Sequence, residues 1–253
     1  MNDSRGRLAA TGAAHIWYGR VPDELAPDGL ALLDDEELRV VRGRRPPFDA
    51  HYAGAHSALR RLLAERYLGV PPGSIRFGRH ICPACGDRAH GRPRIIQPAT
   101  GLEFGLSRSG PHWALAVTAG GDIGVDIEST RDFAPEGVSE LVLSDLELTR
   151  MRAMEHEDDR RDFFLRSWTR KEAVLKAVGI GIVADLRGLD VQPAEAGPVV
   201  VEHTGPGPHR RWLVEEVDLG PGLVAALARE AARGTAPVTL RFLGDVRKGT
   251  ANA

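Results

Sequence analysis

The chain has 253 residues, of which 27% are charged, and its formal net charge at pH 7 is −2. This length can bury the core of one large domain or of two domains of about 120 residues, and the balanced charge gives no basic field that would favour nucleic acid as the main partner. No apolar run reaches the roughly 20 residues of a membrane-spanning helix, residues 1–7 lack the apolar stretch of a signal peptide, and two cysteines make no disulfide framework. We therefore expect a cytoplasmic enzyme with neither nucleic-acid nor membrane partners.

The first half of the chain predicts short strands and two amphipathic helices. An acidic cluster at 34–37 suits a helix N-terminus, and an apolar stripe within 55–67 marks a longer helix that glycine and proline residues end at 69–73. In chain order, the predicted elements are a strand at 15–18, helices at 30–42 and 49–68, a strand at 75–77, a loop at 80–98, and strands at 102–106 and 113–118 around a turn at 107–111.

The second half begins at a glycine-rich join, residues 118–122, and combines a long helix with a sheet. Its predicted elements are a strand at 124–128, helices at 137–143, 145–156 and 159–178, and strands at 186–191, 199–202, 211–216 and 223–228. We therefore divide the chain into an N-terminal half (1–118), a C-terminal half (119–245) and a tail (246–253) that we expect to be disordered.

Two carboxylates lie in the strand predicted at 124–128. Apolar residues alternate there with Gly124, Asp126 and Glu128, so both carboxylates point to the same side, with Cα atoms roughly 7 Å apart. Such a pair also fits the solvated face of a half-buried strand. Asp is nevertheless disfavoured inside strands, and the apolar neighbours indicate burial.

The long helix at 159–178 carries a second set of polar residues. Trp168, Glu172 and Lys176 follow one another at four-residue spacing and lie along one face. A Glu–Lys pair at this spacing is common and contributes only about 0.2–0.5 kcal/mol by itself. Combined with Asp126 and Glu128, however, it completes three carboxylates and a lysine, the groups that a hard divalent cation and a phosphate ester need.

Together the two segments resemble the hallmarks of the 4'-phosphopantetheinyl transferases, in particular the larger pseudo-dimeric class that activates polyketide and nonribosomal peptide synthetases. Residues 124–128 match the family's G-[VI]-D-[IV]-E strand, and residues 168–176 match its W-[ST]-x-K-E-[AS]-x-x-K helix. The resemblance extends from about residue 16 to residue 228. It implies an α+β fold of two similar halves related by a pseudo-twofold axis, with the active site in the cleft between them, and a monomeric protein.

Two further segments are similar to family motifs. His90–Pro93 matches [YHF]-G-[KR]-P, and residues 104–109 match F-N-[IL]-S-H-S with Gly105 in place of asparagine and Arg108 in place of histidine. In the family that histidine is thought to contact the 3'-phosphate of coenzyme A, a contact that arginine can make bidentately and with a permanent charge. The resemblance therefore implies that Arg92 grips the pyrophosphate and that Ser107 and Arg108 hold the 3'-phosphate end.

The resemblance also implies the reaction. Asp126, Glu128 and Glu172 would hold Mg²⁺, and a serine hydroxyl of an acyl or peptidyl carrier protein would attack the β-phosphorus of coenzyme A, so that the 4'-phosphopantetheine arm is transferred and 3',5'-ADP leaves. Glu172 would accept the serine proton, and Lys176 and Lys171 would steady the phosphate charge.

Two other functions remain open. One is a non-catalytic homologue that binds coenzyme A or a carrier protein, which would have no need of all the acids and lysines. The other is a Mg²⁺-dependent phosphohydrolase, which would have no need of the Gly-Arg-Pro and Ser-Arg-Ser segments and should cleave coenzyme A without a carrier.

Four smaller features have competing interpretations. The basic run Arg39, Arg42, Arg44 and Arg45 is either a solvated surface or a grip for coenzyme A phosphates, for which we select Arg39 and Arg42. Phe164 and Trp168 are expected to be core anchors. Residues 138–154 are expected to pack in the core, although their surplus of Leu, Val and Met also suits carrier-protein docking.

The Cys82-Pro83-Ala84-Cys85 segment is the fourth such feature. With His80 and His90 nearby it supplies part of a zinc site, but a structural zinc needs four ligands at credible spacing. A redox Cys-x-x-Cys would sit at a helix start, which this Gly/Pro-rich stretch does not offer. We therefore expect loop cysteines.

Overall fold

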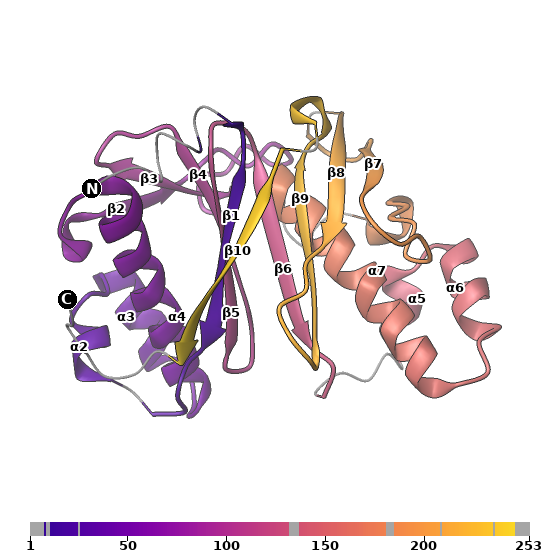
Figure 1. The fold of residues 1–253 in the computed structure, drawn as a ribbon, viewed down its shortest axis with the longest axis horizontal. Helices are drawn as coiled ribbons and strands as arrows, with labels where there is room; N and C mark the ends of the chain where they lie inside the picture. Colours follow the sequence, from indigo (N-terminus) through magenta and orange to yellow (C-terminus); the bar gives the residue numbers. More distant parts are fainter. Residues whose placement is uncertain are drawn as a thin grey trace.

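The structure, a computed structural model, describes residues 8, 11–24, 26–131, 137–180, 185–207, 209–234 and 236–245. The N-terminal segment 1–7 and the tail 246–253, both the subject of sequence predictions, lie outside the described residues. Within the described residues, no helix is both long and apolar enough to cross a membrane. The α+β fold class predicted from the sequence matches the two sheets and the helices packed on them (Figure 1).

The first sheet brings together strands from both ends of the chain. Its strand order is β10 (Val238–Asp245), β1 (Ala14–Arg20), β5 (His112–Ala119) and β4 (Leu102–Ser109). β10 runs parallel to β1, whereas the other neighbours are antiparallel. The helices of this part are α2 (Pro27–Leu30), α3 (Asp35–Arg42) and α4 (Phe48–Leu62), which continues as a π-helical turn at Leu63–Leu68. A separate hairpin pairs β2 (Arg76–Arg79) with β3 (Pro93–Gln97).

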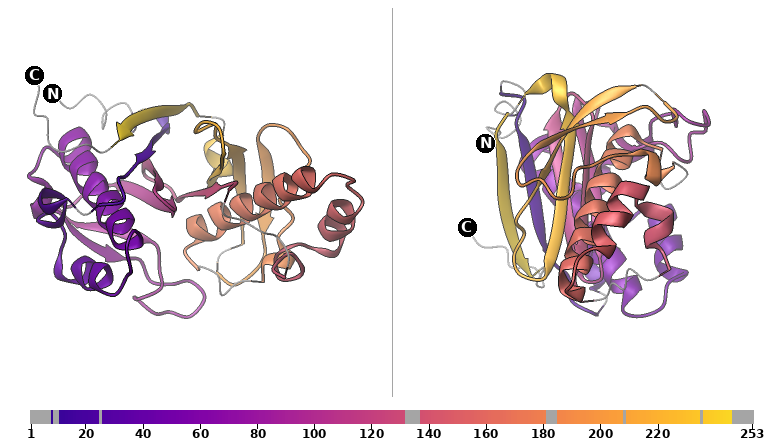
Figure 2. Two further views of the ribbon diagram at one scale, coloured as in Figure 1. Left: turned by 90° about the horizontal axis from the view of Figure 1, so that it is seen from below. Right: turned by 90° about the vertical axis from the view of Figure 1, so that its right-hand side faces the viewer.

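The second sheet is formed by consecutive chain segments around one long helix. Its strand order is β6 (Ile123–Ser129), β9 (Leu223–Glu230), β8 (Arg210–Glu216) and β7 (Val199–His203), all antiparallel. The helices are α5 (Ser139–Val142), α6 (Asp145–Arg152) and α7 (Glu157–Val178). α7 packs against β6, β9 and β8, and in both views of Figure 2 the helices lie on one side of the strands.

A close approach of α7 to β6 explains the glycine that opens the acidic motif. A Cβ at Gly124 would lie 2.1 Å from the carbonyl oxygen of Ala173 and 2.5 Å from the backbone nitrogen of Ala177. No side chain fits there unless the helix moves away. Gly124 therefore sets the distance between the strand that carries Asp126 and the helix that carries Glu172.

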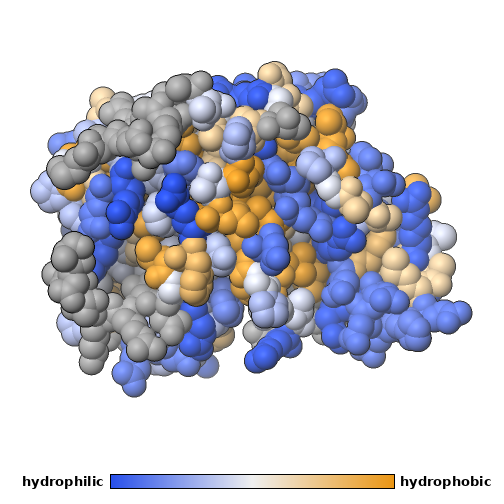
Figure 3. All heavy atoms as spheres, in the orientation of Figure 1, coloured by the Kyte–Doolittle hydropathy of each residue, from blue (hydrophilic) through white to orange (hydrophobic). Residues whose placement is uncertain are grey.

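The two sheets share an apolar core at their junction. Alanine and isoleucine side chains of β1 and β5 pack with Ile123, Val125 and Ile127 of β6 and with Leu227 of β9. Figure 3 shows hydrophobic atoms gathered across the middle of the face on which Figure 1 places β10. β10 itself carries three partly exposed apolar side chains, Leu240, Phe242 and Leu243.

Several predicted boundaries differ from the structure. The strand predicted at 186–191 is wrong, because Leu186–Gly188 forms a 3₁₀ turn and the alternating apolar residues pack as a loop on the core of α7. The predicted loop at 80–98 contains β3, and the predicted turn at 107–111 begins too early, since β4 continues to Ser109. Residues 238–245 join the first sheet, although the sequence assigns them to the C-terminal half.

Candidate active site

The two sheets meet through side chains of β4 that reach the backbone and the acids of β6. Ser107 Oγ donates to Asp126 Oδ1 at 2.8 Å, and Ser109 Oγ donates to Glu128 Oε2 at the same distance. Ser109 Oγ also accepts the backbone N–H of Ser129 at 3.0 Å. Because residues two apart on a strand face the same side, one strand delivers both hydroxyls and the other delivers both carboxylates. The predicted placement of Asp126 and Glu128 on one side of their strand is confirmed by these contacts.

Asp126 is the most buried acid of the site, with 2% of its surface exposed. Its Oδ1 accepts hydrogen bonds from Lys176 Nζ at 2.5 Å and from Ser107 at 2.8 Å, and Lys176 Nζ also lies 2.9 Å from Ser107 Oγ. Its Oδ2 is buried and accepts no hydrogen bond. The helix prediction that placed Lys176 beside the acids is therefore confirmed, and one carboxylate oxygen is left for a further partner.

Glu128 is held from two sides. Ser109 donates to Oε2, and the indole Nε1 of Trp168 donates to Oε1 at 3.1 Å. Burial and the charge of Asp126 raise the pKa of Glu128 above its ordinary value, although the two hydrogen bonds and Lys176 act in the opposite direction. Trp168 was expected to be a core anchor. It does stack on Phe164, but its N–H also orients Glu128, a role that apolar spacing in the sequence cannot indicate.

Glu172 completes the acidic cluster from the helix side. Only 5% of its surface is exposed, and its Oε1 is buried without a hydrogen-bond partner. Burial, then the negative charge of Asp126, raise its pKa to about 7, while Lys176 lowers it and Glu128 raises it. The three carboxylates therefore lie close enough to disfavour one another's ionisation.

These acids offer the donors that a hard cation requires. Two buried carboxylate oxygens lack partners, and a divalent cation would relieve the repulsion that raises the pKa values of Glu128 and Glu172. Among the described residues, however, no group of three or more His, Cys, Asp or Glu side chains is arranged to hold a metal ion as it stands. The donor set fits Mg²⁺, and binding would require the side chains to converge.

The raised pKa of Glu172 predicts a pH-dependent cost to folding. Its pKa of about 7 exceeds its ordinary value of 4.5, so protonated Glu172 is the form that the folded state favours. This contribution to stability is fully present below pH 4.5 and is lost as the pH rises through about 7, by about 3 kcal/mol. In EDTA, Glu172→Gln should gain stability relative to wild type between pH 5 and 8, as measured by urea unfolding. If the difference in free energy of unfolding between the two proteins stays the same from pH 5 to pH 8, the raised pKa assigned to Glu172 is wrong.

Lys171 does not belong to this site. Its side chain is fully buried, and its Nζ donates to Glu147 Oε2 at 2.6 Å and to the carbonyl oxygens of Val142 and Leu186, both at 2.9 Å. All three of its protons are used, so the predicted role in steadying phosphate charge is wrong. Helical geometry explains the error, because five residues turn a helix by about 140° and Lys171 therefore faces away from Lys176.

Arg108 lies on the other side of β4 from Ser107. Its guanidinium is 4.6 Å from the ring centroid of Tyr52, and the guanidinium of Arg44 is 5.1 Å from the same centroid. An open pocket of about 350 Å³ lies beside Arg108 and is lined by residues from α3, α4 and strands β2 to β4, among them Tyr52, His56, Phe77, Pro93 and Leu106. The predicted pairing of Ser107 with Arg108 is thus wrong, because neighbouring residues on a strand face opposite sides.

In the basic run that precedes α4, Arg44 lies over Tyr52, and the selection of Arg39 and Arg42 for coenzyme A stays a prediction. Arg39 and Arg42 are exposed on α3 and do not line the pocket beside Arg108, whereas Arg44 stacks on Tyr52. The sequence predicts a basic run but not which of its arginines reaches Tyr52, because that contact depends on how α3 packs on α4.

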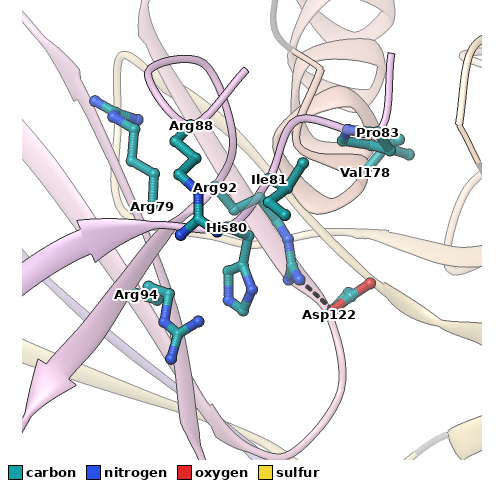
Figure 4. A pocket seen from close by; sticks show the side chains of 9 residues that line it. All are labelled: Arg79, His80, Ile81, Pro83, Arg88, Arg92, Arg94, Asp122 and Val178. Carbon is teal, nitrogen blue, oxygen red and sulfur yellow. Dashed lines mark ion pairs between the residues drawn. The ribbon is translucent and has the colours of Figure 1, made fainter. Parts of the chain in front are cut away.

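Arg92 lines a second pocket, of about 430 Å³, at the edge of the junction (Figure 4). Its guanidinium lies 2.5 Å from Asp122 and 3.7 Å from Glu103. The other charged or ionisable side chains of the pocket are Arg79, His80, Arg88 and Arg94. Positive charge therefore exceeds negative charge, and this pocket suits an anionic group. The predicted contact of Arg92 with a pyrophosphate stays a prediction.

Comparison with known proteins connects this geometry to a family. The family model for the 4'-phosphopantetheinyl transferase superfamily matches residues 122–228, the range that contains Asp126, Glu128, Glu172 and Lys176. The chain is 30% identical over 222 residues to the 4'-phosphopantetheinyl transferase HetI of Nostoc sp. strain PCC 7120, covering 85% of this chain and 86% of that protein. This chain belongs to the 4'-phosphopantetheinyl transferase superfamily.

Other members of the superfamily are also similar to this chain in sequence. The putative 4'-phosphopantetheinyl transferase slr0495 of Synechocystis sp. strain PCC 6803 is 31% identical over 185 residues, covering 68% of this chain and 67% of that protein. The human L-aminoadipate-semialdehyde dehydrogenase-phosphopantetheinyl transferase is 28% identical over 142 residues, covering 52% and 43%. The solved Thermotoga maritima holo-[acyl-carrier-protein] synthase covers 43% of this chain and 62% of its own, at 18% identity and a TM-score of 0.30, a similarity too weak to establish a shared fold.

Proposed function

We propose that this chain transfers the 4'-phosphopantetheine arm of coenzyme A to a serine of an acyl or peptidyl carrier protein, in a Mg²⁺-dependent reaction that releases 3',5'-ADP. The observation that carries this proposal is the cluster of Asp126, Glu128 and Glu172 with Lys176 at the junction of the two sheets. Two acids by themselves occur in many kinds of site. Three carboxylates, two of them buried, that repel one another beside a lysine are suited to a cation and a phosphate together.

Mg²⁺ held by Asp126, Glu128 and Glu172 would neutralise charge on the pyrophosphate of coenzyme A. Lys176, whose side chain is 33% exposed and whose ammonium is already fixed on Asp126, reaches the solvent side of the cluster and can contact a phosphate oxygen. Ser107 and Ser109 hold two of the carboxylates in place, and Trp168 fixes the rotamer of Glu128. These hydrogen bonds orient Asp126 and Glu128 before substrate arrives, which lowers the cost of positioning them.

The transfer step needs a proton acceptor, for which Glu172 is the best suited residue. The serine oxygen of the carrier forms a bond to the β-phosphorus, and the bond from that phosphorus to the bridging oxygen breaks, so that 3',5'-ADP leaves. The serine proton passes to Glu172, whose carboxylate oxygen Oε1 has no hydrogen-bond partner within the protein.

The carrier protein would dock beside α5 and α6. Leu141 and Leu146 are 71% and 56% exposed there, and Val138 is 37% exposed, whereas Val142 and Met151 are buried. The predicted surplus of apolar residues in this segment therefore divides into a core part and an exposed part. Exposed leucines suit the apolar contacts of a transient partner.

The adenosine end of coenzyme A would occupy the pocket beside Arg108. Arg108→Leu should raise the KM for coenzyme A about 10- to 100-fold, because a charge-assisted contact to the 3'-phosphate is lost. The KM for 3'-dephospho-coenzyme A, which lacks that phosphate, should change little. Steady-state kinetics with both substrates provide the measurement. An equal rise for both would show that Arg108 does not contact the 3'-phosphate.

Intact-protein mass spectrometry tests the whole proposal. Apo carrier proteins are incubated with this protein, coenzyme A and Mg²⁺, with EDTA in a parallel reaction. A gain of one phosphopantetheine mass that EDTA abolishes is the expected result. Coenzyme A binding with no mass gain on fatty-acid, polyketide and peptide carriers would instead indicate a non-catalytic homologue, and 3',5'-ADP release without any carrier would indicate a hydrolase.

A further inference from the structure

A loop that the proposed reaction does not use brings two cysteines and a histidine together. This loop, residues 80–92, connects β2 to β3, and its ends are closed by a hydrogen bond from the N–H of His80 to the carbonyl oxygen of Arg92 at 2.8 Å. A Cβ at Gly91 would lie 1.8 Å from the carbonyl oxygen of His80, so the two ends approach as closely as a backbone without a side chain permits. The two ends of the loop are therefore held close together.

The segment from Cys82 to Gly86 forms a tight turn around a thiol. The N–H of Gly86 donates to the carbonyl oxygen of Cys82 at 2.8 Å, and Gly86 has a φ of +75°, a conformation that favours glycine. The backbone N–H groups of Ala84 and Cys85 donate to the buried Cys82 thiol. Hydrogen bonds of this kind stabilise a thiolate, which is the form that binds a metal.

The second cysteine faces a histidine across this turn. Cys85 Sγ lies 3.4 Å from His90 Nδ1. In a tetrahedral zinc site, with zinc–sulfur and zinc–nitrogen bonds of about 2.3 and 2.05 Å, the two ligand atoms lie about 3.6 Å apart. The observed separation is therefore close to that of two ligands on one metal ion. His80, in contrast, is turned to Glu103, with its Nε2 3.0 Å from Oε2.

We propose that Cys82, Cys85 and His90 bind one Zn²⁺ ion, with water in the fourth position. No group of three such side chains among the described residues is placed to hold a metal ion, so the side chains of Cys85 and His90 must move to join Cys82 on the ion. Cys85 and His90 are both exposed and can rotate at little cost, whereas Cys82 is fixed by the turn. On binding, the thiols lose their protons and the Cys85–His90 contact is replaced by bonds to the metal. These metal bonds supply the driving force.

The ligand types favour this ion over Mg²⁺. Two thiolates balance the charge of one Zn²⁺ ion. Thiolate and imidazole ligands select zinc, whereas Mg²⁺ prefers oxygen. Bound zinc would fix the loop that presents Arg88 and Arg92 to the basic pocket of Figure 4. The proposed zinc site shares no residue with the acidic cluster.

Metal content provides a test that does not depend on transferase activity. Protein purified without a histidine tag should contain about one zinc per chain by inductively coupled plasma mass spectrometry. Cys85→Ser and His90→Ala should each lose most of it at equal helicity by circular dichroism. His156→Ala is the matched control and should keep its zinc. His156 is also exposed, but it lies at the opposite end of α7 from the pocket residue Val178, about 30 Å away.

Cobalt substitution adds a spectroscopic signature. Co²⁺ bound to wild type should show a thiolate-to-metal charge-transfer band, which Cys85→Ser weakens and Cys82→Ser, Cys85→Ser together abolish. Wild type that neither contains zinc nor shows this band after reconstitution would overturn the proposal. So would Cys85→Ser with wild-type zinc content. Neither result would bear on the transferase, which the carrier-protein assay tests separately.

Discussion

Replacement of Asp126 by alanine is expected to lower the rate of carrier-protein modification at least about 10³-fold while leaving the fold intact. Asp126 accepts hydrogen bonds from both Lys176 and Ser107, and its Oδ2 remains free for a cation. Its loss removes one predicted Mg²⁺ ligand and releases the ammonium of Lys176. Glu172→Ala should have a loss of similar size. Initial rates by mass spectrometry, with thermal unfolding of each variant, provide the measurement.

A surface acid of the same sheet is the matched control. Glu202 on β7 is 70% exposed at its side chain and forms only a surface ion pair with Arg211, so Glu202→Ala should keep wild-type activity and stability. Full activity in either Asp126→Ala or Glu172→Ala would refute the metal-site assignment. A loss of activity that follows a loss of folded protein would show a structural role instead.

The second large effect concerns stability. Lys171→Met should lower the free energy of unfolding by about 3–5 kcal/mol, because it leaves the buried carboxylate of Glu147 without its cation. It also removes the hydrogen bonds to Val142 and Leu186 that tie α5 and the 3₁₀ turn to α7. Urea unfolding of wild type and variant measures the difference.

Two comparisons make this prediction specific. The double variant Lys171→Met, Glu147→Leu should recover part of the lost stability, since it removes the uncompensated charge. Lys176→Met, five residues along the same helix, should abolish most transfer but cost less stability than Lys171→Met, because its side chain is 33% exposed and Asp126 keeps its hydrogen bond from Ser107. If Lys171→Met unfolds like wild type, Lys171 does not hold α5 and α6 in place. If Lys176→Met keeps full activity, its proposed phosphate contact is wrong.

The contacts of Lys171 also link the fold to the proposed docking surface. α5 and α6 carry the exposed Leu141 and Leu146, and Glu147 both caps α6 at Ser144 and accepts the Lys171 ammonium. The two lysines of the helix motif therefore have different tasks. Lys176 belongs to the acidic cluster, whereas Lys171 holds α5 and α6 against α7.

The acidic centre could be predicted from sequence because its pattern is local. Alternation along 123–128 places Asp126 and Glu128 on one side of a strand, and helical spacing aligns Trp168, Glu172 and Lys176. The same rules also separate residues within one motif. Alternation along β4 places Ser107 and Arg108 on opposite sides of the strand, and helical geometry turns Lys171 away from Lys176.

Other features depend on contacts that no local pattern encodes. β10 pairs with β1 across nearly the whole chain, and its sequence does not name its partner. Arg44, rather than Arg39 or Arg42, reaches Tyr52 because of how α3 packs on α4. Similarly, the Cys85–His90 contact appears only once the hairpin closes the loop at Gly91.

The sequence by itself determined the α+β class, the superfamily and the residues of the acidic cluster, because each follows from short-range periodicity or from a motif. Only the tertiary structure decided which side chains meet: that Ser107 and Ser109 hold the acids, that Trp168 orients Glu128, and that Lys171 is buried on Glu147. The physical reason is that backbone geometry sets the direction of a side chain locally, whereas its partner and its pKa depend on the packing of segments distant in the chain.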